Sequence, residues 1–227
     1  KMKKIALAAL LACCIAGAFA KTWTNNLGFG ASVPFSVTGV DEKNADDITQ
    51  LGYGVEGIYL GYHESGFVAK ADLSVGVGTT KDIKIQDDGT NIGVFEHISV
   101  GAGYAFVRSE SFLLAATAMV GLNVASYTNE EDDVPYTDEN NTVKADYTQA
   151  FSLVSLTAGA DLFAEYRISQ KFGIFANVGV RYLLVGTGIS NWEYEYKTGN
   201  KSVSVSDDDT ESLFGKFCVQ PTLGVMW

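Results

Sequence analysis

Few side chains in this sequence are suited to nucleophilic or metal chemistry. His63 lies in a short polar segment, and His97 precedes Ser99 by two positions. A lone His-x-Ser pair is weak evidence for catalysis, because a nucleophile needs a base and an orienting group together. After residue 20 the only thiol is Cys218, and no Cys/His spacing resembles a metal site. We therefore predict no catalytic residue, no metal and no cofactor, and we expect a protein that is not an enzyme.

A second set of ionisable residues falls on the polar side of segments that alternate between apolar and polar positions. Its members are Glu56, Lys70, Asp72, Asp161, Glu165, Arg181 and Lys216. The spacing places Glu56 opposite Asp72 across the turn at residues 63–66, and it brings Arg181 close to Asp161. Buried charges must pair, so the mixed signs predict an internal salt-bridge network. The alternative is an ion path lined by the same groups.

Five apolar residues share the inward side of their segments near one end: Phe151, Leu153, Leu183, Val185 and Phe214. They predict an apolar wall in the upper part of an internal lumen. Such a wall has two interpretations. It either admits small apolar ligands or packs beneath a surface loop.

Eight segments with period-two alternation have to position these side chains. In the first, odd positions from Trp23 to Val37 are mostly apolar and even positions are mostly small or polar. This alternation is the signature of a strand with one apolar face. The eight segments are residues 23–38, 52–62, 67–79, 95–107, 112–127, 150–167, 172–188 and 213–227.

The seven connections alternate between long and short along the chain. The short ones are residues 63–66, 108–111 and 169–171, and the long ones are residues 39–51, 80–94, 128–149 and 189–212. Outer-membrane β-barrels have short periplasmic turns and long outer loops, whereas a soluble sandwich gives no reason for the alternation. The pattern predicts an eight-stranded antiparallel transmembrane β-barrel with an up-and-down meander.

Aromatic residues near the segment ends agree with a membrane barrel. Trp23 and Phe35 share a face twelve residues apart, which corresponds to roughly 28 Å along the membrane normal. The predicted periplasmic girdle contains Phe67, Phe106, Phe112, Tyr166 and Phe172, and the outer girdle contains Phe35, Tyr53 and Tyr182. The last segment places Phe217, Val219, Leu223, Val225 and Trp227 on one face, with Pro221 as a candidate bulge.

Charge is concentrated in the long connections. The formal net charge is −11, which argues against a nucleic-acid partner. The four long connections hold 20 of the 27 acidic residues and 6 of the 16 basic ones. Acidic loops are either simply solvated or bind a cation or a partner. The alternating Trp192, Tyr194 and Tyr196 predict a surface hairpin within residues 189–212, or two barrel strands that extend above the membrane.

The first twenty residues have the pattern of a secretory signal peptide. Lys1, Lys3 and Lys4 precede an apolar run, and Ala18-Phe19-Ala20 supplies a small-x-small cleavage site. We expect export, cleavage after Ala20 and a barrel over residues 21–227. The alternative is a lipoprotein anchored at Cys13, but the apolar residues after that cysteine do not resemble a polar tether.

Taken together, the signal peptide, the eight strands and the aromatic C-terminal strand resemble those of the small OmpA/OmpX/OmpW-like barrels. The resemblance implies a bacterial outer-membrane protein, inserted into lipid by the barrel-assembly machinery, which reads the alternating last strand. The leading hypothesis is a non-enzymatic surface barrel, structural or adhesive, that binds host or extracellular ligands through its loops. The alternative is a porin-like, OmpW-like narrow channel for small hydrophobic molecules.

Overall fold

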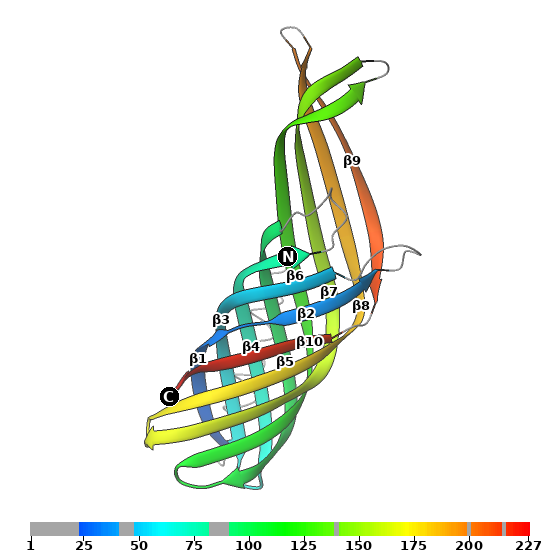
Figure 1. Cartoon of the computed structure of the whole chain (residues 1–227). Coiled ribbons are helices and arrows are strands. Elements are labelled where there is room, and N and C mark those ends of the chain that lie inside the picture. Colours follow the sequence, from blue (N-terminus) through cyan, green and yellow to red (C-terminus); the bar gives the residue numbers. More distant parts are fainter. Residues whose placement is uncertain (1–22, 41–47, 82–90, 139–140, 199–200, 215–216) are drawn as a thin grey trace.

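The chain forms a closed antiparallel β-barrel from which one sheet projects (Figure 1). This computed structural model describes residues 23–40, 48–81, 91–138, 141–198, 201–214 and 217–227. The predicted signal peptide and Lys216 lie outside them. Among the described residues, no helix has the length and apolar character needed to cross a membrane.

Ten strand segments build the wall, and together they form a ring of eight barrel strands. β1 and β2 form one barrel strand, β9 and β10 form another, and the remaining segments form one each. Their bounds are β1 Trp23–Ser32, β2 Phe35–Val40, β3 Ile48–His63, β4 Phe67–Lys81, β5 Asn91–Arg108, β6 Phe112–Asp138, β7 Asn141–Ser169, β8 Phe172–Thr198, β9 Lys201–Phe214 and β10 Phe217–Met226. Neighbours along the chain pair with each other, and pairing of β1 with β10 closes the ring. The predicted fold class is confirmed.

Two prolines explain why the first barrel strand is divided. Pro34 lies between β1 and β2, and Pro221 lies opposite Val33 in β10. A proline has no N–H for the ladder, so the regular pairing stops there. Val33 N still donates to Pro221 O at 3.0 Å, and the register of β10 against β8 continues through Pro221 without a shift. The predicted bulge at Pro221 is therefore absent.

The short turns occur where the sequence predicts them. The turn at residues 63–66 contains Gly66, whose φ of 96° is in the left-handed region that favours glycine. A Cβ at this position would also lie 2.7 Å from the ring of Tyr104. Gly66 N donates to His63 O at 2.8 Å and closes the turn.

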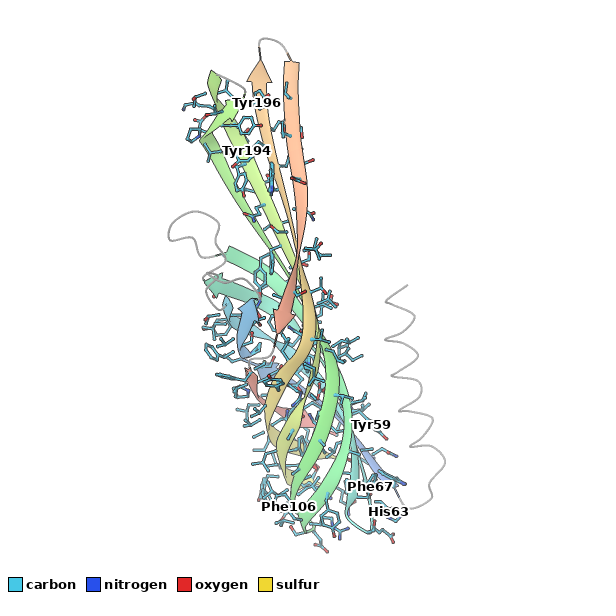
Figure 2. All side chains as sticks on the ribbon, turned by 90° about the vertical axis from the view of Figure 1, so that its right-hand side faces the viewer. Tyr59, His63, Phe67, Phe106, Tyr194 and Tyr196 are labelled. Atoms are coloured by element: carbon cyan, nitrogen blue, oxygen red, sulfur yellow. The ribbon has the colours of Figure 1, made fainter. Side chains whose placement is uncertain are left out.

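Alternation along each strand separates an apolar outer surface from a polar interior. Leu73, Val75 and Val77 of β4 are exposed on the outside, whereas Lys70 and Asp72 are buried. An exposed apolar belt around a closed barrel is stable only when lipid covers it. The predicted girdle residues lie on this outer face, and Figure 2 shows Phe67 and Phe106 at the end of the barrel that carries the short turns.

Two of the predicted long loops are instead strand extensions. β6 pairs with β7 up to Asp138 and Asn141, and β8 pairs with β9 up to Thr198 and Lys201. Residues 128–149 and 189–212 thus form two long hairpins, and the second follows the predicted alternation of Trp192 with the tyrosines. The loop predicted over residues 128–149 was wrong, because strand pairing continues through its acidic residues. For residues 189–212, the predicted hairpin or strand extension is present.

Candidate functional site

Lys70 of β4 is the centre of a charge network in the lumen. Its Nζ lies 2.9 Å from Oδ2 of Asp72 and also donates to Asp161 of β7, on another part of the wall. The Lys70 side chain is fully buried, and both carboxylates are nearly so. A buried ammonium group needs such partners, because desolvation of an unpaired charge costs several kcal/mol or more.

Arg181 of β8 completes this network. Its Nη1 donates to Asp161, and its Nη2 lies 3.7 Å from Oδ2 of Asp72 and 3.3 Å from Ser99 Oγ. Ser99 in turn donates to Asp72 at 2.6 Å. These ion pairs link β4, β7 and β8. Arg181 lies beside Asp161, as the spacing of the two residues predicted.

Glu56 and Glu165 lie outside the central network. Glu56 accepts hydrogen bonds from Thr222 and Gln220 of β10. Its cross-strand neighbour is Ser74, so the expected position opposite Asp72 was wrong. The reason is the register, because the ladder beside the turn begins with Tyr62 opposite Val68.

Glu165 belongs to a separate group near the short-turn end. Arg167 Nε lies 3.2 Å from Oε1 of Glu165, and Asn26 Nδ2 lies 3.4 Å from its Oε2. The Arg167 guanidinium also stacks 5.3 Å from the ring centroid of Tyr62. Arg167 was missed from the sequence, although its basic side chain two residues after Glu165 was a usable signal.

The predicted apolar wall is only partly present. Phe151 and Leu153 are buried in a cluster with Phe95, Tyr127 and Leu213. They therefore pack against other side chains. The side chain of Phe214 lies outside the described ones.

Val185 does not belong to the apolar wall that the sequence predicted, so that part of the prediction was wrong. Leu183 is 7% exposed and points inward, but Val185 is 60% exposed and points outward. The cause is a β-bulge, since Leu156 pairs with Val185 while the next residue of β7, Thr157, pairs with Leu183. One extra residue in β8 reverses the phase of every position after it.

A small cavity lies in the lumen beside this network. Its volume is about 50 Å³, which holds a few waters and is far below the roughly 300–1,000 Å³ of sites for drug-sized ligands. His97, Ser155, Thr157, Arg181 and Cys218 contribute to its lining. His97 is 7% exposed and its side chain faces this cavity.

A second candidate site is the protruding sheet, formed by residues 129–138, 141–150, 189–198 and 201–212 of β6 to β9. Figure 1 shows these strands rising away from the barrel, and Figure 2 shows Tyr194 and Tyr196 at the end opposite His63. The sheet has its own core of Val134, Ala145 and Tyr196. Because that core is separate from the barrel interior, the sheet is a second packed unit on the same chain.

One face of the protruding sheet is aromatic. Ring centroids lie 4.8 Å apart for Tyr136 and Tyr194, 4.6 Å for Tyr147 and Tyr194, and 5.7 Å for Trp192 and Tyr194. The hairpin bends where Asp133 has a φ of 61° and the β6–β7 register shifts. Such ring pairs each stabilise a structure by about 0.5–1.5 kcal/mol beyond burial.

The opposite face is acidic. Asp146 of β7 pairs directly with Glu195 of β8, and Glu193 lies two positions from Glu195 on the same face. All three side chains are exposed. On β9 this face carries Ser204 and Ser206, of which Ser204 donates to Glu193.

The C-terminal strand has the predicted sidedness. Phe217, Leu223, Val225 and Trp227 are exposed on the outside, and Val219, on the same side, is partly buried. On the inside, Gln220 and Thr222 contact Glu56. Thus β10 contributes to both the outer belt and the lumen.

Comparisons with known proteins find likenesses of backbone shape. Neisserial surface protein A is 11% identical with a TM-score of 0.49, and the match covers 91% of this chain and 98% of that one. A major outer membrane protein of Thermus thermophilus is 13% identical with a TM-score of 0.49, over 88% and 98% of the two chains. The attachment invasion locus protein Ail of Yersinia pestis, in complex with the heparin analogue sucrose octasulfate, is 13% identical with a TM-score of 0.40, over 92% and 100%.

No family model matches the chain, and no curated protein matches it in sequence. At these identities the structural likenesses concern the fold alone. The function therefore has to be inferred from the chain's own residues.

Proposed function

We propose that this protein is a non-enzymatic surface protein of a bacterial outer membrane, in which the barrel anchors the protruding sheet and the sheet binds an extracellular partner. The observation that carries the proposal is the continuation of β6 to β9 as a packed sheet beyond the barrel. Lipid anchorage alone does not require such an extension. A sheet held away from the membrane is well placed to meet another macromolecule.

The closed lumen supports an anchoring role for the barrel. Lys70, Asp161 and Arg181 bridge the interior with ion pairs. The cluster containing Phe95, Tyr127 and Phe151 fills the lumen in a second place. An eight-stranded barrel has an interior just wide enough for side chains, so these groups leave little room for a diffusing solute.

The experiment compares the protein with a variant in which both hairpins of the protruding sheet are shortened, by removing residues 130–147 and 193–206. Bacteria that express either form are tested for attachment to epithelial cell layers. We expect attachment to fall to the level of cells without the protein, while the barrel still shows the heat-dependent gel shift of a folded form. Unchanged attachment of a folded, shortened variant would contradict the proposal.

A conductance measurement tests the alternative of a narrow channel. The refolded barrel in a planar bilayer should give no reproducible current steps, with or without an apolar detergent ligand. Small steps that the detergent blocks would favour the hydrophobic-molecule channel instead.

A further inference from the structure

We propose that the partner of the protruding sheet is an extended basic polypeptide segment, in which lysine or arginine alternates with apolar residues, and that it adds to the sheet as a strand beside β9. This inference rests on the proposed function and specifies the chemistry of the partner. It follows from the edge of the sheet, its two unlike faces and its charge.

The side of β9 that faces away from β8 is an edge of the protruding sheet. β9 pairs with β8 from Lys201 to Leu213, but among the described residues it pairs with β2 on its other side only at Leu213 and Phe214. Among the described strands, none pairs with residues 203–206 on that side. A strand edge presents backbone donors and acceptors in a row, and another extended chain can pair with them.

The two faces determine which side chains an added strand needs. Val203 and Val205 lie on the aromatic face, opposite Tyr196 and Tyr194, and are partly buried. Ser204 and Ser206 lie on the acidic face. Side chains of a strand alternate between faces, so the partner segment needs apolar residues at every second position. Those residues would extend the aromatic cluster by one strand.

The charge of the protruding sheet determines which residues the partner segment needs between its apolar ones. Residues 128–149 and 189–212 contain thirteen acidic residues and three lysines. One of the lysines, Lys144, already pairs with Asp133 at 3.0 Å. Asp146, Glu193 and Glu195 are exposed on the acidic face, so the charge of this face favours a partner of opposite sign.

Strand spacing allows cationic side chains of the partner to reach this face. A strand added beside β9 lies about 10 Å from β8, two interstrand spacings away. The long side chains of lysine or arginine on the added strand extend over Ser204 and Ser206 toward Glu193 and Glu195. The partner therefore alternates basic and apolar residues in register with the two faces.

The test uses the full barrel, refolded in detergent micelles, and a labelled peptide of about ten residues that alternates lysine and valine. Fluorescence anisotropy measures binding, and hydrogen exchange measures protection of the backbone amides in residues 203–206. We expect saturable binding, slower exchange at this edge and weaker binding at high salt.

Peptide controls separate strand addition from charge alone. A peptide with the same composition but with lysines and valines in two blocks should bind at least several-fold more weakly. N-methylation at every second residue, which removes backbone donors, should abolish the amide protection. A block or N-methylated peptide that binds as well as the original would overturn strand addition.

Protein variants test the acidic face. Replacing both opposed acids (Asp146→Asn with Glu195→Gln) should weaken binding roughly ten-fold, which corresponds to about 1.4 kcal/mol. The matched control Glu110→Gln removes an exposed acid in a short turn at the other end and should change nothing. Equal loss in the control would mean that the peptide responds only to net charge, which would contradict the inference.

The outcomes for this inference and for the proposed function are distinguishable. If the shortened-hairpin variant loses cell attachment but the alternating peptide does not bind the intact protein, the sheet is a partner site for another chemistry and only the present inference fails. If attachment does not depend on the hairpins, the proposed function fails first.

Discussion

Lys70 Nζ lies 2.9 Å from Oδ2 of Asp72, a residue two positions further along the same strand, and both side chains are buried in the barrel. Residues two apart on a strand point to the same face, so this contact needs no long-range folding step. The contact of Lys70 with Asp161, in contrast, joins β4 to β7 across the lumen. One ammonium group thereby combines a local pair with a cross-barrel link.

Removal of this ammonium should destabilise the barrel strongly. In Lys70→Met, Asp72 and Asp161 lose the ammonium group that contacts both. Among the described side chains they keep Arg181 and, for Asp72, the His97 ring at 3.8 Å, so one buried carboxylate loses most of its compensation. We expect the free energy of unfolding to fall by about 3–5 kcal/mol. Equilibrium urea unfolding in lipid vesicles measures it. The exposed Lys171→Met in a short turn is the control, and a loss for Lys70→Met no larger than that of the control would contradict the assigned role.

The bulge in β8 predicts the side-chain reactivity of two neighbouring positions. In a chain without residues 1–20 and with Cys218→Ser, single Val185→Cys and Leu183→Cys variants are compared in micelles. Because Val185 is 60% exposed and Leu183 is 7% exposed, N-ethylmaleimide should modify the first at least ten-fold faster. Similar rates would mean that the bulge is absent and that residue 185 points inward.

Close packing between β5 and β6 predicts a strict requirement for glycine at position 103. A Cβ on Gly103 would overlap the carbonyl oxygen of Ala116, so the strands have to separate. Gly103→Ala should cost about 1–3 kcal/mol of unfolding free energy. Its neighbour Ala102 faces outward and is exposed, and Ala102→Val should change the same quantity by no more than about 0.5 kcal/mol.

The aromatic contacts predict that the protruding sheet can be loosened without harm to the barrel. Tyr136→Ala removes ring contacts with Tyr194 and Tyr196, at centroid distances of 4.8 Å and 5.3 Å. Hydrogen exchange in residues 134–147 should accelerate, while the exchange of β4 and β5 amides stays unchanged. Thr137→Ala, which alters only an exposed hydroxyl pair with Thr142, is the matched control. Acceleration throughout the barrel would show that the two units are not separate.

The sequence by itself determined the strands and their sidedness. Alternation from Trp23 to Val37, and in seven further segments, specifies which residues meet lipid and which face the lumen, since successive strand side chains point to opposite faces. The three short turns followed from the same pattern. The inward positions of Lys70, Asp72, Asp161 and Arg181 were predictable for this reason.

The tertiary structure decided register and phase. Glu56 faces Ser74, because Tyr62 pairs with Val68, a register two residues away from the one that would place Glu56 opposite Asp72. Val185 points outward because a bulge adds one residue to β8. Neither effect has a local sequence signal, since both depend on how two strands align.

The protruding sheet also depended on tertiary pairing. The acidic residues in 128–149 and 189–212 resemble those of solvated loops, yet both segments are paired strands. In the first hairpin the pairing includes Asn129 opposite Gln149, and in the second it continues to Thr198 opposite Lys201. The sequence contained the alternation of Trp192, Tyr194 and Tyr196, but not the bend at Asp133 that brings Tyr136 onto them. Packing between distant rings decides that geometry, because ring contacts form only after the hairpins align.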